Sequence, residues 1–169
     1  MRFIVLISVL ACMTGCMSVD PELPDRTKNI EAVERFVYDV FGAGNLDAID
    51  EIISPEYVGY WAGWGETRGR DELRQGIAEW RTAFPDWSGK IETIVADGDT
   101  VVIRLTSRGT FLGPLGDITP NQGTVEIAEM AILRLVDGLV VEHWEMTDGW
   151  SLERQLGIRM PDFGARPAW

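Results

Sequence analysis

Apolar residues recur with the spacing of an amphipathic helix in three segments of the first half of the chain, residues 29–44, 45–54 and 69–85. Glycine or proline follows the periodic positions of each segment, at Gly42, Pro55 and Pro85. These residues end helices, because glycine leaves the helical conformation easily and proline disfavours it in the residue before. The pattern therefore predicts three helices ahead of the rest of the fold.

The second half of the chain changes to strand patterns. Segments rich in β-branched residues alternate apolar and polar positions over residues 89–98, 100–113, 123–136 and 139–147. Asp-Gly pairs at 97–98 and 137–138 predict tight hairpin turns. A short aromatic strand at 57–61 precedes the third helix, and a helical turn at 151–158 follows the last strand. Helices followed by a hairpin-connected antiparallel sheet indicate one α+β domain, with bounds 29–158.

The first residues carry the pattern of an export signal. In MRFIVLISVLACMTGC, a basic residue precedes an apolar run of the length found in secretory signals. The end of this stretch resembles the bacterial lipobox, in which a cysteine becomes the lipid-modified first residue, and Cys16 fits it better than Cys12. We therefore expect a lipid-anchored protein of a bacterial cell envelope, with a plain secretory signal or a membrane-anchored segment as the alternatives. The parts outside the domain are then a signal peptide at 1–15, a lipidated tether at 16–28 and a tail at 159–169.

The charge and composition of the chain limit the classes of binding partner that we expect. The chain has 27 acidic and 15 basic residues, a formal charge of −12 and a pI near 4.4. The basic residues are scattered, so nucleic acid is not an expected partner, and membrane contact is expected only through the lipid. One histidine among scattered carboxylates lacks the ligand spacing of a metal site. The predicted domain contains no cysteine, which rules out a disulfide or thiol chemistry within it.

The chain's single histidine lies in the stretch VVEHWEMTDGW, residues 140–150. Successive side chains of a strand face opposite sides, so His143 shares a face with Glu145, and Trp144 shares the other with Met146. Two interpretations are open. The face of His143 lines a polar pocket, or it is an ordinary strand face on which His143 hydrogen-bonds a neighbouring acid.

Several short motifs, in their order, resemble a known family. RFVYDVFGAGNLDAIDEIISPEYV, AFPDW, VDGLVVEHW and LERQLGI follow one another within residues 29–158. Together they resemble the SnoaL-like polyketide cyclases, or ester cyclases, of the nuclear transport factor 2-like superfamily. The resemblance implies a cone in which a curved antiparallel sheet wraps around three N-terminal helices and encloses one pocket. Such a fold hosts many functions and does not by itself define the reaction.

The resemblance also implies which residues react. The position of Glu145 is similar to that of the catalytic aspartate of the cyclases, which puts His143 and Glu145 inside the cone. The family chemistry is an intramolecular aldol closure that needs neither metal nor organic cofactor. Glu145 is then the predicted base, and His143 or Asp148 would hold it or relay a proton. The chain departs from the pattern twice, since glutamate replaces aspartate and Ala131 stands where the cyclases carry a histidine.

The register of the last hairpin decides which carboxylates meet. A two-residue turn at Asp137-Gly138 pairs Val136 with Leu139. We expect instead a three-residue turn with a glycine bulge, because the resemblance requires Ala131 and Glu145 on one face. The bulged turn gives the pairs Leu135–Leu139, Ala131–His143 and Glu129–Glu145. Two carboxylates close together in an apolar pocket are expected to raise the pKa of at least one of them.

The predicted ligand pocket is mainly aromatic, and its residues are Tyr57, Tyr60, Trp61, Trp80, Phe84 and Ala131. The catalytic candidates are Glu145, His143, Asp148 and Glu129. Each has a structural alternative. A core is favoured over a ligand site for the tryptophans Trp61, Trp64, Trp80 and Trp87, Glu129 would face solvent in the other register, and Asp148 could cap the final helix.

Two functions fit these patterns. In the first, the domain is a cofactor-free cyclase, isomerase or hydrolase acting on a small apolar carbonyl compound. In the second, it is a non-catalytic, tethered binding module for a small hydrophobic ligand. The acidic pair favours the enzyme, and the export signal favours the binding module. An outward apolar patch also predicts a two-fold homodimer, its residues being Met130, Ile132, Val140, Trp144 and Met146.

Overall fold

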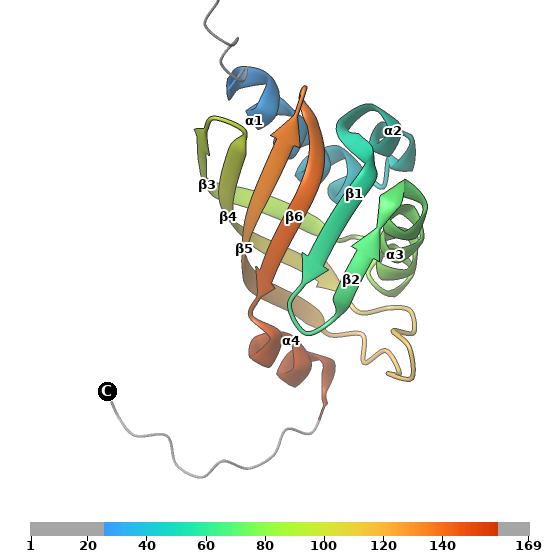
Figure 1. Cartoon of the computed structure of the whole chain (residues 1–169). Coiled ribbons are helices and arrows are strands. Elements are labelled where there is room, and N and C mark those ends of the chain that lie inside the picture. Colours follow the sequence, from blue (N-terminus) through green and yellow to red (C-terminus); the bar gives the residue numbers. More distant parts are fainter. Residues whose placement is uncertain (1–25, 159–169) are drawn as a thin grey trace, which may run out of the picture.

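The computed structural model of the chain describes residues 26–158 (Figure 1). Its helical elements are α1 (Arg26–Arg35), the π-helix η1 (Phe36–Gly42), the 3₁₀ turn η2 (Leu46–Ala48), α2 (Ile49–Ile52), α3 (Gly69–Ala83) and α4 (Gly149–Leu156). Its strands are β1 (Ile53–Trp61), β2 (Gly65–Arg68), β3 (Ser88–Asp97), β4 (Thr100–Thr110), β5 (Thr124–Val136) and β6 (Leu139–Thr147). The predicted α+β class is confirmed.

The predicted export segment lies outside the described residues, together with both cysteines and the C-terminal tail. The first helix already begins at Arg26, three residues before the predicted domain boundary. Within the described part of the chain, no helix is long and apolar enough to span a bilayer.

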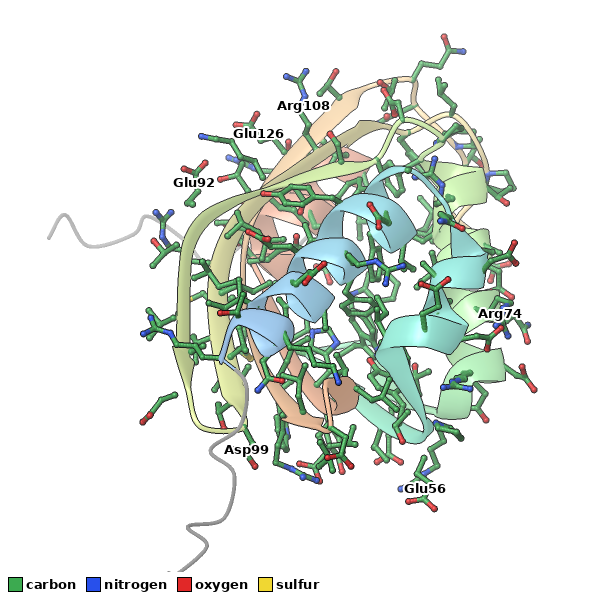
Figure 2. The ribbon with its side chains drawn as sticks, turned by 90° about the horizontal axis from the view of Figure 1, so that it is seen from above. Glu56, Arg74, Glu92, Asp99, Arg108 and Glu126 are labelled. Atoms are coloured by element: carbon green, nitrogen blue, oxygen red, sulfur yellow. The ribbon has the colours of Figure 1, made fainter. Side chains whose placement is uncertain are left out.

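Six strands form one curved sheet in the order β2-β1-β6-β5-β4-β3. Strands β3 to β6 are antiparallel neighbours, as predicted. β1, however, runs parallel to β6, so the expectation of a wholly antiparallel sheet is wrong at this one pairing. The chain leaves β1 through β2 and α3, builds the sheet from its far edge at β3, and returns to β1 only with β6. The sheet curls around α1, and α2 and α3 complete the enclosed side (Figures 1 and 2).

β2 was not predicted from the sequence. It pairs antiparallel with the end of β1 and extends the sheet by one short edge strand. Gly63 and Gly65 have φ values of 83° and 106°, and these conformations let the chain turn back directly after Trp61. The strand is too short and too polar to show an alternating pattern.

The hairpin between β5 and β6 corrects the predicted register. Asp137 and Gly138 have φ values of 53° and 80° and form the two-residue turn that pairs Val136 with Leu139. A bulge at Val141 then shifts the pairing by one residue. The resulting pairs are Leu135–Val140, Leu133–His143, Ala131–Glu145 and Glu129–Thr147. The predicted direct pairs Leu135–Leu139, Ala131–His143 and Glu129–Glu145 are therefore wrong, although Ala131 and Glu145 do share a face.

Two apolar clusters stabilise the fold by removing their side chains from water. The first joins α1, η1 and α3 to the concave face of the sheet, for example through Val33, Ile77 and Leu133. The second lies where α4 and the end of α3 pack on β4 and β5, and it contains Phe84 and Phe111. A cavity lies where the two clusters meet, because residues of both line it.

The outer face of the sheet carries an exposed apolar patch. Tyr60 stacks on Trp144, with ring centroids 5.7 Å apart, and Trp144 pairs with Ile132 on β5. Met130 pairs with Met146 beside them. Val140 was predicted to belong to this patch, and this prediction is wrong: Val140 is fully buried, because the bulge at Val141 turns it inward.

Candidate functional site

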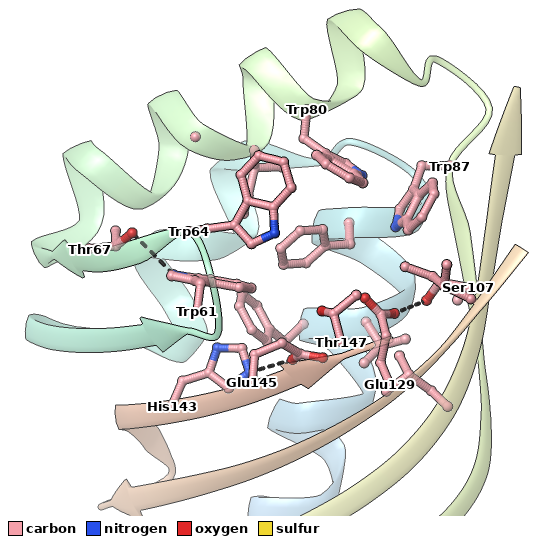
Figure 3. A pocket seen from close by; sticks show the side chains of 18 of the residues that line it. Trp61, Trp64, Thr67, Trp80, Trp87, Ser107, Glu129, His143, Glu145 and Thr147 are labelled. Carbon is pink, nitrogen blue, oxygen red and sulfur yellow. Dashed lines mark hydrogen bonds and ion pairs between the residues drawn. The ribbon is translucent and has the colours of Figure 1, made fainter. Parts of the chain in front are cut away.

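The cavity has a volume of about 480 Å³ and lies between the sheet and the helices. Its wall is largely apolar, with both aliphatic and aromatic side chains, and the aromatic residues are Phe36, Phe41, Trp61, Trp64, Trp80 and Trp87. Its polar side chains gather on the concave face of the sheet (Figure 3), and there they are Ser107, Glu129, His143, Glu145 and Thr147. Such a cavity suits a small, mainly apolar ligand with a few polar groups at one end.

His143 is fixed from four sides. The residue is only 2% exposed, and its ring meets the rings of Trp61 and Phe36 edge-on at 4.7 and 5.5 Å between centroids. Nδ1 lies 3.1 Å from the hydroxyl of Tyr57, and Nε2 lies 2.9 Å from Oε2 of Glu145. The imidazole thus joins a buried tyrosine to a carboxylate at the cavity.

The direction of this hydrogen-bond chain follows from the chemistry of its members. Burial, together with the charge of Glu145, raises the pKa of Tyr57, so its O–H remains a donor. In a neutral imidazole only one nitrogen carries a proton, and Nε2 faces a carboxylate acceptor. Tyr57 therefore donates to Nδ1, and Nε2–H of His143 donates to Oε2 of Glu145. Gly59 makes room for this arrangement, since a Cβ there would overlap the Tyr57 hydroxyl.

The second oxygen of Glu145 has no partner. Its side chain is 10% exposed, and Oε1 is buried without a hydrogen bond among the residues described. Buried polar atoms are almost always satisfied, and a carboxylate oxygen left without a partner in an apolar site is destabilising. Such an atom is typical of a functional group that meets its partner only when a ligand is bound.

Glu129 lies on the same inner face, one strand away. Ser107 donates a hydrogen bond to its Oε2, and the hydroxyl of Thr147 also hydrogen-bonds the carboxyl group. Burial, and then the charge of Glu145, raises the pKa of Glu129 to about 8. Glu129 is therefore a carboxylic acid at neutral pH, and it can donate a proton that an ordinary glutamate has already lost.

The structure places the predicted site residues in different surroundings. Trp61 and Trp80 line the cavity, whereas Tyr57 lies behind it as the partner of His143. Phe84 and Ala131 are buried beside the cavity without lining it.

Two predicted site residues lie elsewhere. Tyr60 is on the outer face of the sheet, because its position in β1 has the opposite parity to Tyr57 and Trp61. Asp148 accepts a hydrogen bond from the backbone N–H of Ser151 and caps α4, which is the structural alternative for this residue.

Sequence reasoning did not name Ser107 or Thr147 as site residues, and it favoured the core for Trp64 and Trp87, which line the cavity. Ser107 had a detectable signal, because it is the polar member of the inward alternation Val101, Ile103, Leu105 along β4. Across residues 26–158 there is no group of three or more histidine, cysteine or acidic side chains that could hold a metal ion.

Comparisons with known proteins agree with this geometry. The profile of the SnoaL-like polyketide cyclase family matches residues 31–156, so the chain belongs to this family. It is 27% identical over 124 residues to nogalonic acid methyl ester cyclase of Streptomyces nogalater, covering 72% of this chain and 92% of that enzyme.

Solved structures show the same fold. TsrD from Streptomyces laurentii is 28% identical, with a TM-score of 0.71 over 80% of this chain and 98% of that one. A protein from Jannaschia sp. CCS1, described as a SnoaL-like polyketide cyclase, is 24% identical with a TM-score of 0.74 and supports the fold alone, over 84% and 99% of the two chains. The nuclear transport factor 2-like fold expected from the motifs is confirmed, and family membership supports a cyclase- or isomerase-type function.

Proposed function

We propose that the domain is a cofactor-free acid–base enzyme that cyclises or isomerises a small apolar carbonyl compound inside the cavity. One observation carries the proposal: Oε1 of Glu145 is buried and unpartnered in an aromatic cavity, while Oε2 is held by His143. A carboxylate oriented through one oxygen presents the other as a base. The similarity to an enzyme named as an ester cyclase adds support for ring closure as the reaction.

The proposed reaction uses the two glutamates in different protonation states. Oε1 of Glu145 removes a proton from a carbon next to one carbonyl, and the carbanion attacks the second carbonyl of the same molecule, whose C=O π bond becomes the alkoxide. The carboxylic acid of Glu129 then protonates the new alkoxide. One C–C bond has formed, and the substrate has lost and gained one proton. A proton passing from Glu145 to Glu129, which lie on the same face of neighbouring strands, restores the starting state.

The acidic side chains that line the cavity favour a ligand without a negatively charged group. The cavity lining includes Glu79, Glu129 and Glu145, and no lysine or arginine lines it within the described residues. A carboxylate or phosphate on the ligand would lose its hydration without gaining a counter-ion, which is strongly unfavourable. The proposed substrate is therefore an uncharged carbonyl compound, held by aromatic contacts.

A binding module remains the second candidate, and the aromatic wall is the observation that favours it. Such a module needs apolar contacts and no proton transfer. The experiment that separates the two is substitution of Glu145 by glutamine, since only an enzyme has turnover to lose.

We also propose that the chain is exported and held at the bacterial envelope by a lipid on Cys16, a residue outside those described. The motif MTGC at residues 13–16 supports this anchor. Cys16→Ser is then expected to move the protein from the membrane fraction to the soluble fraction of cells, because the lipid is the only expected attachment. Cys12→Ser is the matched control and should stay with the membranes. Unchanged membrane association of the Cys16 variant would refute the anchor.

The proposed homodimer uses the outer apolar patch, formed by Tyr60, Met130, Ile132, Trp144 and Met146. All of these are between 39% and 65% exposed, which is unusual for a continuous row of large apolar side chains. A charge at its centre, Trp144→Glu, is expected to give monomers in sedimentation measurements. Leu112→Glu replaces an equally exposed apolar residue outside the patch and should not change the assembly. A wild-type chain that is monomeric at high concentration would contradict the proposal.

A further inference from the structure

The inward stripe of α3 has one position without a side chain. Leu73 and Ile77 are buried by the core, and Trp80 lines the cavity one turn further on. Gly76 belongs to the same face, because it lies three residues after Leu73 and four before Trp80. An apolar side chain is expected at this position, and the helix has glycine instead.

Neither conformation nor packing requires this glycine. Gly76 lies in the interior of a 15-residue helix, and its φ is not in the left-handed region that favours glycine. No atom of the surrounding fold lies within 4 Å of where its Cβ would be. Glycine inside a helix is destabilising relative to alanine, so the position is held against the preference of the helix itself. A reason outside the stability of the fold is therefore needed.

The space in front of Gly76 is the outer part of the cavity. Gly76 lines the cavity and is nevertheless exposed, so solvent reaches this part of the wall. Trp64, from the turn between β1 and β2, is 55% exposed, lines the same cavity and meets Trp80 edge-on at 6.1 Å between centroids. Gly116, from the loop between β4 and β5, also lines it and has open space at its Cβ position. These three elements surround an opening, in contrast to the enclosed end at Glu145.

We propose that Gly76 is a specificity-determining residue that keeps this opening wide for an elongated ligand. One end of the ligand meets Glu145 at the enclosed end, and the other passes Gly76 towards solvent. The inference rests on the proposed function only in taking the cavity as the ligand site, and it does not depend on turnover. It adds a shape to the proposed substrate class: an uncharged carbonyl compound with several rings or a chain, longer than the enclosed part of the cavity.

The test compares ligands of increasing size with variants of increasing bulk. Acetophenone, 2-acetylnaphthalene and 2-acetylanthracene are uncharged ketones with one, two and three rings. Their binding to the purified chain is measured by quenching of tryptophan fluorescence. Gly76→Leu is expected to lower the affinity for the three-ring ketone by about 10–100-fold, the effect of forcing extra methylene groups into filled space. The affinity for the one-ring ketone should change by less than about two-fold.

Two further variants separate specificity from stability. Gly76→Ala is expected to raise the melting temperature by about 2–4 °C, since it removes the helix penalty of glycine. It should lower the affinity for the three-ring ketone less than Gly76→Leu does. Ala78→Leu places a leucine side chain two residues away, at an exposed position that does not line the cavity, and should leave all three affinities unchanged. Two results with Gly76→Leu would overturn the role of Gly76. One is an equal loss of affinity for all three ketones, and the other is an unchanged affinity for the three-ring ketone.

The result also separates this inference from the proposed function. Binding that depends on size through Gly76, in a chain without turnover, would support the inference and contradict the enzyme. A wild-type chain that binds none of the three ketones would contradict the cavity as a ligand site, and both proposals with it.

Discussion

Substitution of Glu145 by glutamine is expected to lower the turnover of an uncharged 1-aryl-1,5-hexanedione, a diketone whose terminal methyl carbon can close a six-membered ring, by about 10²–10⁴-fold, the usual contribution of a general base. Glutamine has nearly the same shape, and its amide oxygen can still accept the hydrogen bond from Nε2 of His143. It cannot accept a proton from carbon. The measurement is the disappearance of the open-chain diketone, followed by chromatography, in parallel with its affinity for the protein.

Affinity and stability should respond differently from turnover. Removing a buried charge that lacks a partner on Oε1 is expected to leave ligand affinity level or to increase it. The matched control is Glu142→Gln, one residue before His143, where the side chain forms an ion pair with Arg134. That variant should keep wild-type turnover.

The outcomes distinguish the two candidate functions. Turnover that falls in the Glu145 variant, with affinity and folding retained, supports the base. Full turnover in that variant would exclude Glu145 as the base. A wild-type chain that binds the diketone without converting it would favour the tethered binding module.

The sequence predicted the class and most elements of the fold because the periods of its apolar residues are long and regular. The strand β5 is the clearest case, since all odd positions from Val125 to Leu135 face inward and all of them are apolar except the functional Glu129. The Asp-Gly pair at 137–138 is the turn of its hairpin as predicted, and the pair at 97–98 marks the other hairpin, although the turn itself is Gly98-Asp99 because Asp97 pairs with Thr100. Local patterns of this kind depend on burial of one face, which the sequence records directly.

The register of β6 could not be predicted in the same way. The choice between a tight turn and a bulged turn depends on the φ angles of Asp137 and Gly138 and on the bulge at Val141. The Asp-Gly pair did indicate the tight turn, and the expectation of a bulged turn came from the resemblance. The bulge at Val141 leaves no pattern in the alternation of neighbouring residues. The shift reassigned the partners of Glu129 and His143 while preserving which side chains face the cavity.

The chain from Tyr57 through His143 to Glu145 shows a second limit of sequence reasoning. Tyr57 and His143 are separated by 86 positions and meet only because β1 runs parallel beside β6. Gly59, directly opposite His143 in that pairing, leaves space for the hydroxyl. Contacts between distant strands of this kind follow from the topology of the sheet.

Stability is expected to fall as the pH rises from about 5 to 9, and Glu129 should account for much of the change. Its folded-state pKa is raised from 4.5 to about 8, mainly by burial. Between these values the folded chain holds a proton that the unfolded chain has released, so raising the pH favours unfolding. The stabilising effect of the bound proton is complete below the unfolded pKa and is lost as the pH passes about 8. Because one pKa unit corresponds to about 1.4 kcal/mol, the loss amounts to several kcal/mol.

The measurement is urea-induced unfolding at pH 5, 7 and 9 for the wild type, Glu129→Gln and Glu126→Gln. Glutamine at position 129 stays neutral and can still accept the hydrogen bond from Ser107, so this variant should match the wild type near pH 5 and exceed it at pH 9. Glu126 is an exposed residue on the same strand, and its variant should follow the wild-type curve. Glu145→Gln should reduce in part the slope of the unfolding free energy against pH, because the charge of Glu145 is the second cause of the raised pKa of Glu129. Equal slopes in the wild type and the Glu129 variant would show that Glu129 is not the acid of the site, and the proton donor to the alkoxide would then have to be sought elsewhere in the cavity.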